Sequence, residues 1–308
     1  VIEKIPFSRC YSYFIFLLTS LLMNIRRLLS PLLGFGATSK IHIWQRFEPI
    51  GEGIAGTMSK FYKAHDKESD QLVGLKLPNM EKVAPIESRF QGLNKPREGE
   101  IGKIIQGDHV VKTHEFGKTH DGGQFIVQDF LDGTLVHFRL KRGEKLSPDE
   151  RMNMIVQTAI GVATVHEAGF VHRDICPRNL MLSNSGITTL FDFGLSVPNK
   201  PAFLRPGNRT GTPNYMAPEV IRRRQSDHRL DIFSFGVTAY EIYSGQLPWP
   251  GGDARAALAH DTPAPDIREI ANGIPDRLAD VIMDCLRSDP NDRHDSMNLL
   301  LQKMRRLT

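Results

Sequence analysis

Cysteine is scarce in this sequence of 308 residues, and the three present, Cys10, Cys176 and Cys285, lie far apart. A count this small and odd excludes a disulfide framework and offers no metal-ligand spacing. A large excess of one charge is also lacking, since the net charge is only +4. This mild charge excludes a strongly basic nucleic-acid-binding protein, and we expect no nucleic-acid partner. Reduced thiols indicate a cytoplasmic location.

Long apolar runs are also lacking. The longest, residues 10–25, contains four polar side chains and is shorter than the roughly 20 residues that a spanning helix needs. A second apolar patch continues to residue 37 and is broken by Pro31. Three interpretations of residues 1–40 stay open: membrane association on the cytoplasmic face through residues 10–37, an extension docked on the core, or a start site assigned too far upstream. A secretory signal is disfavoured, because the chemistry inferred below needs cytosolic nucleotide.

From residue 41 to residue 308 the composition is that of a globular domain, without repeats or low-complexity linkers. Residues 44–130 predict strands and turns, with a hairpin around the turn at residues 119–123. One helix is expected over residues 96–107. Its two glycines, Gly99 and Gly102, each lower helix propensity by up to about 1 kcal/mol relative to alanine, so we expect this helix to be mobile.

After Gly133 the pattern becomes helical. Ser147, Pro148 and Glu150 resemble a capping box with proline at the first helical position. Further helical periodicity covers residues 231–245 and 276–289. The sequence therefore predicts an α+β protein with a strand-rich N-lobe (41–131), a helical C-lobe (132–308) and a site between them.

Eight short motifs follow one another in a fixed order. They are IGEGIAGTMSKFYKA, VGLK, a glutamate-bearing helix, HRDICPRN, FDFG, GTPNYMAPE, DIFSFG and DPNDR. Each alone is weak, but together they resemble the eukaryotic-type (Hanks-type) Ser/Thr protein kinases from about Trp44 onward. The resemblance implies the bilobal protein-kinase fold, and ATP- and Mg²⁺-dependent phosphoryl transfer to serine and threonine hydroxyls of proteins, including autophosphorylation.

The resemblance assigns the transfer chemistry to four residues. Asp174 would orient the acceptor hydroxyl and accept its proton, while Asn179 and Asp192 would supply hard oxygen ligands to magnesium. Lys76, on an apolar strand, would contact the α- and β-phosphates. Glu98 and Glu100 compete as its acidic partner, and counting back from the following strand favours Glu98.

The glycine-rich stretch departs from the family. Gly51, Gly53 and Gly56 satisfy G-x-G-x-x-G, and the register counted back from Lys76 places Phe61 over the adenine. Three extra residues then remain. Either the loop is longer, or Gly56 and Ser59 cover the phosphates. Further along, Asp129 and Leu131 resemble the hinge that offers backbone groups to adenine, with Gln128 as gatekeeper.

Cys176 stands where Ser/Thr kinases usually carry a lysine that touches the transferring phosphate. Loss of that cation would cost several kcal/mol if nothing replaced it. Arg178, at the position where tyrosine kinases carry an arginine, is the expected replacement. For the thiol itself, a redox-sensitive group and a buried inert one both remain open.

The remaining family positions concern control and support. Thr212 resembles the threonine that bonds the catalytic loop in Ser/Thr kinases, and Thr210 is the candidate for autophosphorylation, because Arg173 is suited to meet its phosphate. Three residues are expected to be structural: Glu219, Asp231 and Arg293.

Two questions stay open from the sequence. Cys176, the irregular glycine loop and the helix glycines would also suit a pseudokinase, a scaffold that binds nucleotide or a partner without catalysis. Arg222–Arg224 is either a solvated face or a contact for acidic substrates. The oligomeric state is not indicated.

Overall fold

The computed structural model of the protein describes residues 40–249 and 262–305. The extension expected over residues 1–40, with its apolar segment 10–37, therefore lies outside the described residues except for Lys40. Within the described ranges, every helix is too short or too polar to span a membrane.

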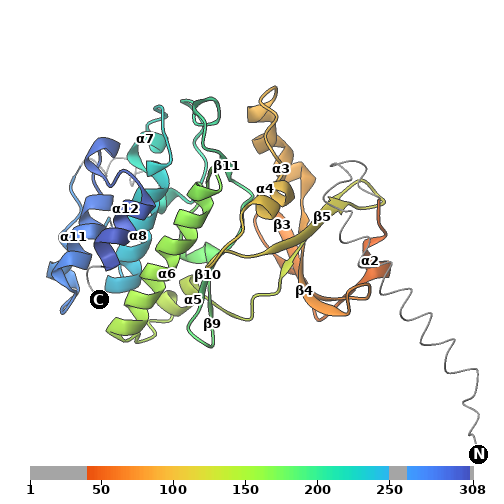
Figure 1. Ribbon diagram of the computed structural model, residues 1–308, viewed down its shortest axis with the longest axis horizontal. Coiled ribbons are helices and arrows are strands. Elements are labelled where there is room, and N and C mark those ends of the chain that lie inside the picture. The colour runs from red at the N-terminus through yellow and green to blue at the C-terminus, as the bar shows by residue number, and fades with distance from the viewer. Residues whose placement is uncertain (1–39, 250–261, 306–308) are drawn as a thin grey trace, which may run out of the picture. The chain divides into compact units, whose positions relative to one another are not determined.

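A six-stranded antiparallel sheet forms the first part of the described chain (Figure 1). Its strands are β1 (Phe47–Pro49), β2 (Ile54–Ala55), β3 (Ser59–Asp66), β4 (Gln71–Pro78), β5 (Thr113–Lys118) and β6 (Gln124–Asp129). The spatial order is β1-β3-β4-β6-β5, with β2 paired to β3. β5 and β6 pair as the hairpin that the turn residues predict.

One face of this sheet covers a small apolar core. Its buried members are Ile43, Phe47, Ala64, Val73, Leu75, Phe125 and Val127. Successive side chains of a strand point to opposite faces, so Lys76 of β4 lies on the face opposite to Leu75. The hydrophobic pattern of β4 therefore aims Lys76 away from this core.

The helix predicted between the strands is α4 (Glu98–Ile104). The expectation of a single helix in this region was wrong, because α2 (Ile43–Arg46), α3 (Met80–Glu87) and the 3₁₀ turn η1 (Ser88–Phe90) also form. α3 buries none of its residues and contains Pro85. It therefore lacks the apolar stripe by which a helix is recognised in sequence, and proline normally argues against a helix interior.

The second part is mainly helical, which confirms the α+β class (Figure 1). Its helices are α5 (Val136–Lys141), α6 (Pro148–Glu167), α7 (Pro218–Ile221), α8 (Arg229–Ser244), α10 (Ile267–Ile270), α11 (Asp276–Cys285) and α12 (Met297–Arg305). The predicted capping box of α6 is present: the Ser147 hydroxyl accepts from the Glu150 backbone and Glu150 accepts from the Ser147 backbone.

Short strands and 3₁₀ turns carry the loops of this part. They are β7 (Gly133–Leu135), β8 (Phe170–Val171), η2 (Pro177–Asn179), β9 (Leu180–Ser183), β10 (Thr188–Leu190), β11 (Val197–Pro198), η3 (Pro201–Phe203), η4 (Pro213–Tyr215) and η5 (Pro290–Asp292). β9 pairs with β7 and β10, while β8 pairs with β11. Strand pairing therefore holds the chain just before His172, through β8, and just before Phe193, through β10.

α4 connects the sheet to the helical part. Its buried Ile101, and Ile105 just after its last turn, pack in the large core that α6, α8 and α11 form, rather than in the small core under the sheet. The position of this helix therefore depends on both parts of the fold.

A buried ion pair fixes the end of the helical part. Both guanidinium NH groups of Arg293 donate to Glu219, at 2.8 Å each, and Arg293 also donates to the backbone carbonyls of Arg229, Arg287 and Ser288. The Arg293 side chain is 0% exposed. Removal of one partner from such a pair leaves an uncompensated buried charge.

We expect Arg293→Met to lower the free energy of unfolding by about 3 kcal/mol, because Glu219 would lose its counterion. Chemical denaturation followed by circular dichroism measures this change. Arg142→Met, which removes an exposed ion pair to Glu144, is the control and should change the midpoint little. Equal effects of the two variants would contradict a special contribution of the buried pair.

Candidate active site

Lys76 joins three segments that are distant in sequence. Its ammonium donates to Glu98 of α4 at 2.5 Å and to Asp192 at 2.8 Å. Glu100, the competing partner, instead accepts from the Arg97 backbone and caps α4. The structure thus brings Lys76 together with Glu98 and Asp192, and leaves Glu100 outside.

The charges in this triad favour the ionised forms of Lys76 and Asp192. Burial disfavours the Lys76 ammonium, but the neighbouring Asp192 and Glu98 carboxylates outweigh it and raise the pKa of Lys76. Burial opposes ionisation of Asp192 too, yet Lys76 holds the pKa of that carboxyl below its usual value. Burial, with the nearby Asp192 charge, raises the pKa of Glu98. Lys76 therefore remains a cation between its two partners.

The two glycines of α4 allow this helix to approach β5 closely. A Cβ at Gly99 would overlap Phe116, and a Cβ at Gly102 would overlap the Thr113 hydroxyl and lie 3.6 Å from Phe193. Both glycines are buried. They therefore bring α4 near enough to β5 for Glu98 to reach Lys76, which gives them a packing reason apart from mobility.

Asp174 is held from both sides by hydrogen bonds. The Asn179 amide donates to its Oδ2 at 2.9 Å and to its backbone carbonyl at 2.8 Å. The backbone N–H and the hydroxyl of Thr212 both donate to Oδ1 at 2.8 Å. The carboxylate of Asp174 therefore has a fixed orientation, and Thr212 makes the contact that the resemblance implied.

Asp231 of α8 holds the backbone of the loop that carries Asp174, at residues 172–173. Its carboxylate accepts from the backbone N–H groups of His172 and Arg173, at 2.7 and 2.8 Å, and bonds the His166 ring at 2.9 Å. Burial disfavours its charge, but these bonds keep the pKa of Asp231 below its usual value. Arg173 adopts a positive φ of 72°, a strained conformation that this anchor stabilises.

Cys176 is buried beside the reaction centre. Its sulfur lies 3.7 Å from the Thr212 hydroxyl, and burial, with the Asp174 charge, raises its pKa to about 12. A thiol with this pKa stays protonated near neutrality, which favours a buried inert thiol over a redox-sensitive one. Arg178, two residues later, has an exposed side chain.

Asn179 and Asp192 keep oxygen atoms that suit a hard cation. Asn179 uses its Nδ2 for Asp174, so its Oδ1 points elsewhere. The hydrogen bonds of Asp192 within the described residues are all made by its Oδ1. No cluster of three or more His, Cys, Asp or Glu that could hold a metal occurs in the described ranges. Two protein oxygens fit magnesium, which commonly completes its shell with water and phosphate.

The glycine-rich hairpin has its tip at residues 56–59, where the Gly56 backbone donates to the Ser59 carbonyl. Ile54 pairs with Phe61, and Gly51 and Gly53 lie before the tip, between β1 and β2. This register agrees with the alternative in which Gly56 and Ser59 cover the phosphates. Met58, at the tip, reaches toward Gly194 of the FDFG segment.

Phe61, the residue expected to lie over adenine, packs against Gly74 of β4. Its ring would be 2.7 Å from a Cβ at Gly74, and the Asp129 carbonyl would be 3.0 Å from the same point. The Asp129 N–H is bonded to the Lys112 carbonyl, and Leu131 follows just past β6. Gln128 is buried at this edge. Phe61 and Gly74 together therefore set the space beside the predicted hinge.

Sequence reasoning missed Arg89, which contacts the predicted phosphorylation residue. Its guanidinium donates to the Thr210 hydroxyl at 3.0 Å, and that hydroxyl donates to Asn208. Arg173 donates to the Asn208 carbonyl at 3.2 Å. Arg89 belongs to η1. The contact joins residues 121 positions apart, so no local sequence pattern predicts it.

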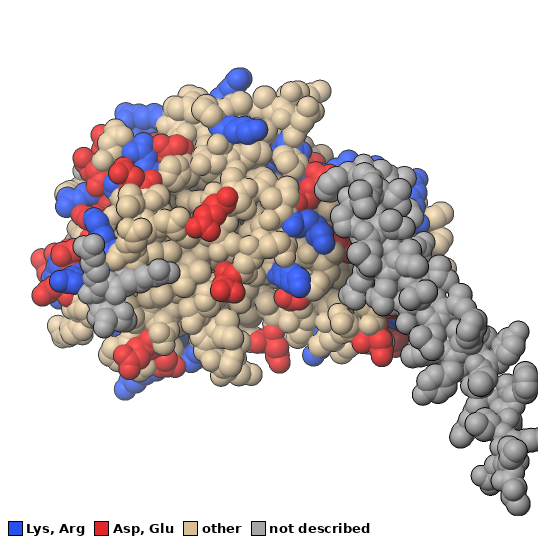
Figure 2. Space-filling view, viewed as in Figure 1, with Lys and Arg blue, Asp and Glu red and all other residues tan. Residues whose placement is uncertain are grey.

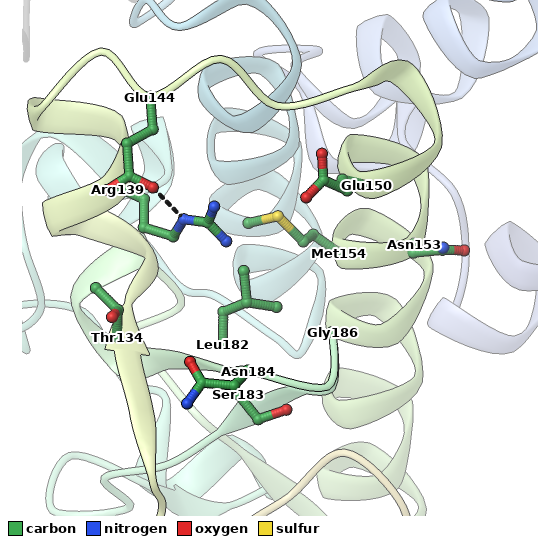
Figure 3. Close-up of a pocket in the computed structure, with 10 residues that line it drawn as sticks. All are labelled: Thr134, Arg139, Glu144, Glu150, Asn153, Met154, Leu182, Ser183, Asn184 and Gly186. Atoms are coloured by element: carbon green, nitrogen blue, oxygen red, sulfur yellow. Dashed lines mark hydrogen bonds and ion pairs between the residues drawn. The ribbon is translucent and has the colours of Figure 1, made fainter.

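A separate pocket of about 390 Å³ lies between α5, α6 and the β9–β10 hairpin (Figure 3). It is lined by Thr134, Arg139, Glu144, Glu150, Asn153, Met154, Leu182, Ser183, Asn184 and Gly186. Arg139 and Glu144 pair at its wall. It contains none of the residues expected to bind ATP or transfer phosphate.

Comparison with known proteins agrees with this geometry. Residues 44–304 match the family model of the protein kinase domain. The serine/threonine-protein kinase pkn3 of Myxococcus xanthus is 29% identical over 259 residues, which cover 79% of this chain and 46% of that protein. PknA of Corynebacterium glutamicum is 30% identical, covering 79% and 52%, and PknE of Mycobacterium bovis is 30% identical, covering 78% and 42%. The chain spans about half the length of these curated relatives.

We expect Gly102→Ala to destabilise the protein, although alanine is the better helix former by about 1 kcal/mol. The added methyl would push α4 from β5 and separate Glu98 from Lys76. Thermal unfolding measures the first effect, and the KM for ATP measures the second. Ile104→Ala, at an exposed position of the same helix, is the matched control. A higher melting temperature for Gly102→Ala would contradict the close packing.

Proposed function

The chain belongs to the family of eukaryotic-type serine/threonine protein kinases, and on this premise we propose that it transfers the γ-phosphoryl group of ATP to serine and threonine hydroxyls of proteins. The single observation that carries the proposal is the fixed carboxylate of Asp174, bonded by Asn179 and Thr212. The Lys76–Glu98–Asp192 triad supports it. ATP and protein substrates imply a cytoplasmic site of action.

In the proposed reaction, Asp174 orients the acceptor hydroxyl and accepts its proton as the oxygen attacks the γ-phosphorus. Lys76 neutralises the α- and β-phosphates, and Glu98 keeps its ammonium in position. Magnesium, held through Asn179 and Asp192, would supply charge neutralisation on the phosphate oxygens. Gly56 and Ser59 at the hairpin tip cover the phosphates, while Phe61 and the Asp129–Leu131 backbone contact adenine.

Serine and threonine are favoured over tyrosine because Thr212 bonds Asp174 directly. This contact resembles the Ser/Thr branch of the family. It also fixes the loop that would lie against the acceptor, which leaves Asp174 with little freedom to adjust to a longer tyrosine side chain.

Arg178 supplies the cation that Cys176 lacks. A neutral buried thiol offers nothing to the developing charge of the transferring group, and an electrostatic donor at that point is normally among the largest contributions to the rate. Arg178 follows Asp174 by four residues on the same loop and is permanently charged. The pseudokinase alternative finds no support in the comparisons, and the presence of Lys76, Glu98, Asp174, Asn179 and Asp192 supports an active kinase instead.

We expect the chain to transfer labelled phosphate from magnesium-ATP to itself and to peptides. Asp174→Asn should lower the rate about a hundredfold or more, because the proton acceptor is lost. Arg178→Ala should lower the transfer rate about tenfold. This loss is smaller than that expected on removal of a buried donor, because Arg178 is exposed. The readout is label on acid-stable phosphoserine or phosphothreonine.

Lys67→Ala, at an exposed position of the β3–β4 turn, controls for a general effect of charge loss. Intact nucleotide binding without any transfer by the wild-type chain would contradict the proposal and indicate a scaffold. Transfer that Arg178→Ala leaves unchanged would remove only the role given to Arg178.

We further infer that Thr210 is the autophosphorylation site. Arg173 is a buried guanidinium that donates to the carbonyls of Leu195 and Asn208. Burial, with the repulsion from Arg89, lowers its pKa to about 10. A phosphate on Thr210 would place two negative charges beside Arg89, which already bonds this hydroxyl, and near Arg173. These arginines favour the phosphorylated form.

Mass spectrometry of the protein after incubation with magnesium-ATP should find phosphate on Thr210. Arg89→Ala should reduce the increase in substrate phosphorylation that follows this modification, because one partner of the phosphate is removed. Arg97→Ala, a nearby arginine exposed at the start of α4, is the control. An active protein with Thr210 unmodified would overturn this assignment.

A further inference from the structure

Basic side chains dominate the segment that leads away from Asp174. Between Leu195 and Arg224 the only acidic residue is Glu219, which is buried and paired with Arg293. The same stretch holds six basic residues: Lys200, Arg205, Arg209, Arg222, Arg223 and Arg224. All except Arg222, which is half-buried, are exposed. The charge of this segment is thus of one sign at the surface.

Arg209 is close in the chain to residues that contact the Asp174 carboxylate. A Cβ at Gly211 would be 3.8 Å from the Asp174 Oδ1, and Thr212 bonds that atom, so Arg209 is two residues from Gly211 and three from Thr212. Arg223 and Arg224 close α7 through backbone bonds to Val220 and Glu219. Over the region where Figure 1 shows α7, Figure 2 shows Lys and Arg side chains interspersed with Asp and Glu.

A second group of basic residues lies where α5 packs against the catalytic loop. Lys141 belongs to α5, which packs against η2, the turn that carries Arg178. Burial lowers the pKa of the nearby His137, and the charges of Arg178 and Lys141 lower it further. The carboxylate on this side, Glu241, accepts from the buried Tyr215 hydroxyl and faces the charge of Arg178. It is therefore already engaged by groups of the protein.

Among the described residues, the exposed guanidinium groups of Arg178, Arg205, Arg209, Arg223 and Arg224 form no ion pair with a carboxylate. Clustered like charges repel one another unless a partner of opposite sign arrives. A substrate that brings carboxylates to both sides of its hydroxyl would relieve this repulsion.

We propose that this active site selects peptides in which acidic residues flank the phosphoacceptor serine or threonine. The inference rests on the proposed kinase activity and specifies its substrate class. Arg209, Arg223 and Arg224 contact carboxylates on one side of the acceptor, and Arg178 and Lys141 contact those on the other. Substrates with flanking lysine or arginine are disfavoured by the same cations, which is how like charge gives specificity.

The test uses the full chain, magnesium-ATP and a degenerate peptide library with one central threonine. Total label in the library reports kinase activity, and the residues enriched in the labelled peptides report the preference. We expect Asp and Glu to be enriched about tenfold over Lys and Arg at flanking positions. The enrichment should weaken as the salt concentration rises from roughly 0.05 to 0.5 M.

Arg209→Glu/Arg223→Glu should abolish or reverse the enrichment while total label persists. Lys67→Glu/Lys112→Glu, two exposed positions in the β3–β4 turn and just before β5, changes the net charge equally and should leave the enrichment intact. Total label without acidic enrichment in the wild-type chain would overturn the inference while leaving the kinase activity standing. Absence of total label would overturn the proposed function, and with it this inference.

Discussion

A single buried cation, Lys76, constrains the arrangement of the whole catalytic region. Its ammonium bonds Glu98 and Asp192, so β4, α4 and the FDFG segment must meet at one point. Burial of a lone ammonium would cost several kcal/mol, and the Asp192 and Glu98 carboxylates offset this cost. The triad is therefore stable when all three segments are in position and unfavourable when one moves away. This makes α4 the element whose displacement disconnects the site.

Close packing and electrostatics act together on α4. Gly99 and Gly102 remove side chains that would keep the helix from β5, while Ile101 and Ile105 attach it to the core of the helical part. The Thr113 hydroxyl occupies the space where a Cβ of residue 102 would lie. Gly102 therefore lowers helix propensity but shortens the distance between Glu98 and Lys76. The same residues that lower helix propensity therefore permit the ion pair.

Chemistry made the central residues predictable from sequence, and tertiary packing hid the others. Phosphoryl transfer needs carboxylates and a cation at fixed spacings, so Lys76, Asp174, Asn179 and Asp192 stand out in the motifs. The choice between Glu98 and Glu100 depends on which side of a short helix faces β4. Two of the buried residues on that side are Gly99 and Gly102, which have no apolar side chain to mark it in the sequence. α3 buries no residue, and Arg89 meets Thr210 across 121 positions of the sequence. No local pattern carries such contacts, because they arise only when the chain has folded.

Cys176 and the exposed arginines belong to one redistribution of charge. The position that contacts Thr212 and Asp174 holds a neutral thiol, while Arg178 and the arginines around α7 carry positive charge at the surface. A buried cation acts in a low dielectric and resists salt, whereas an exposed one is screened within about 8 Å at physiological ionic strength. In the proposed reaction, positive charge at the rim therefore acts on the transferring phosphate more weakly than a buried cation would. In the proposed substrate recognition, the same exposed charges attract an acidic peptide over a longer range, so the loss of a buried cation and the preference for substrates with their own negative charge have one electrostatic origin.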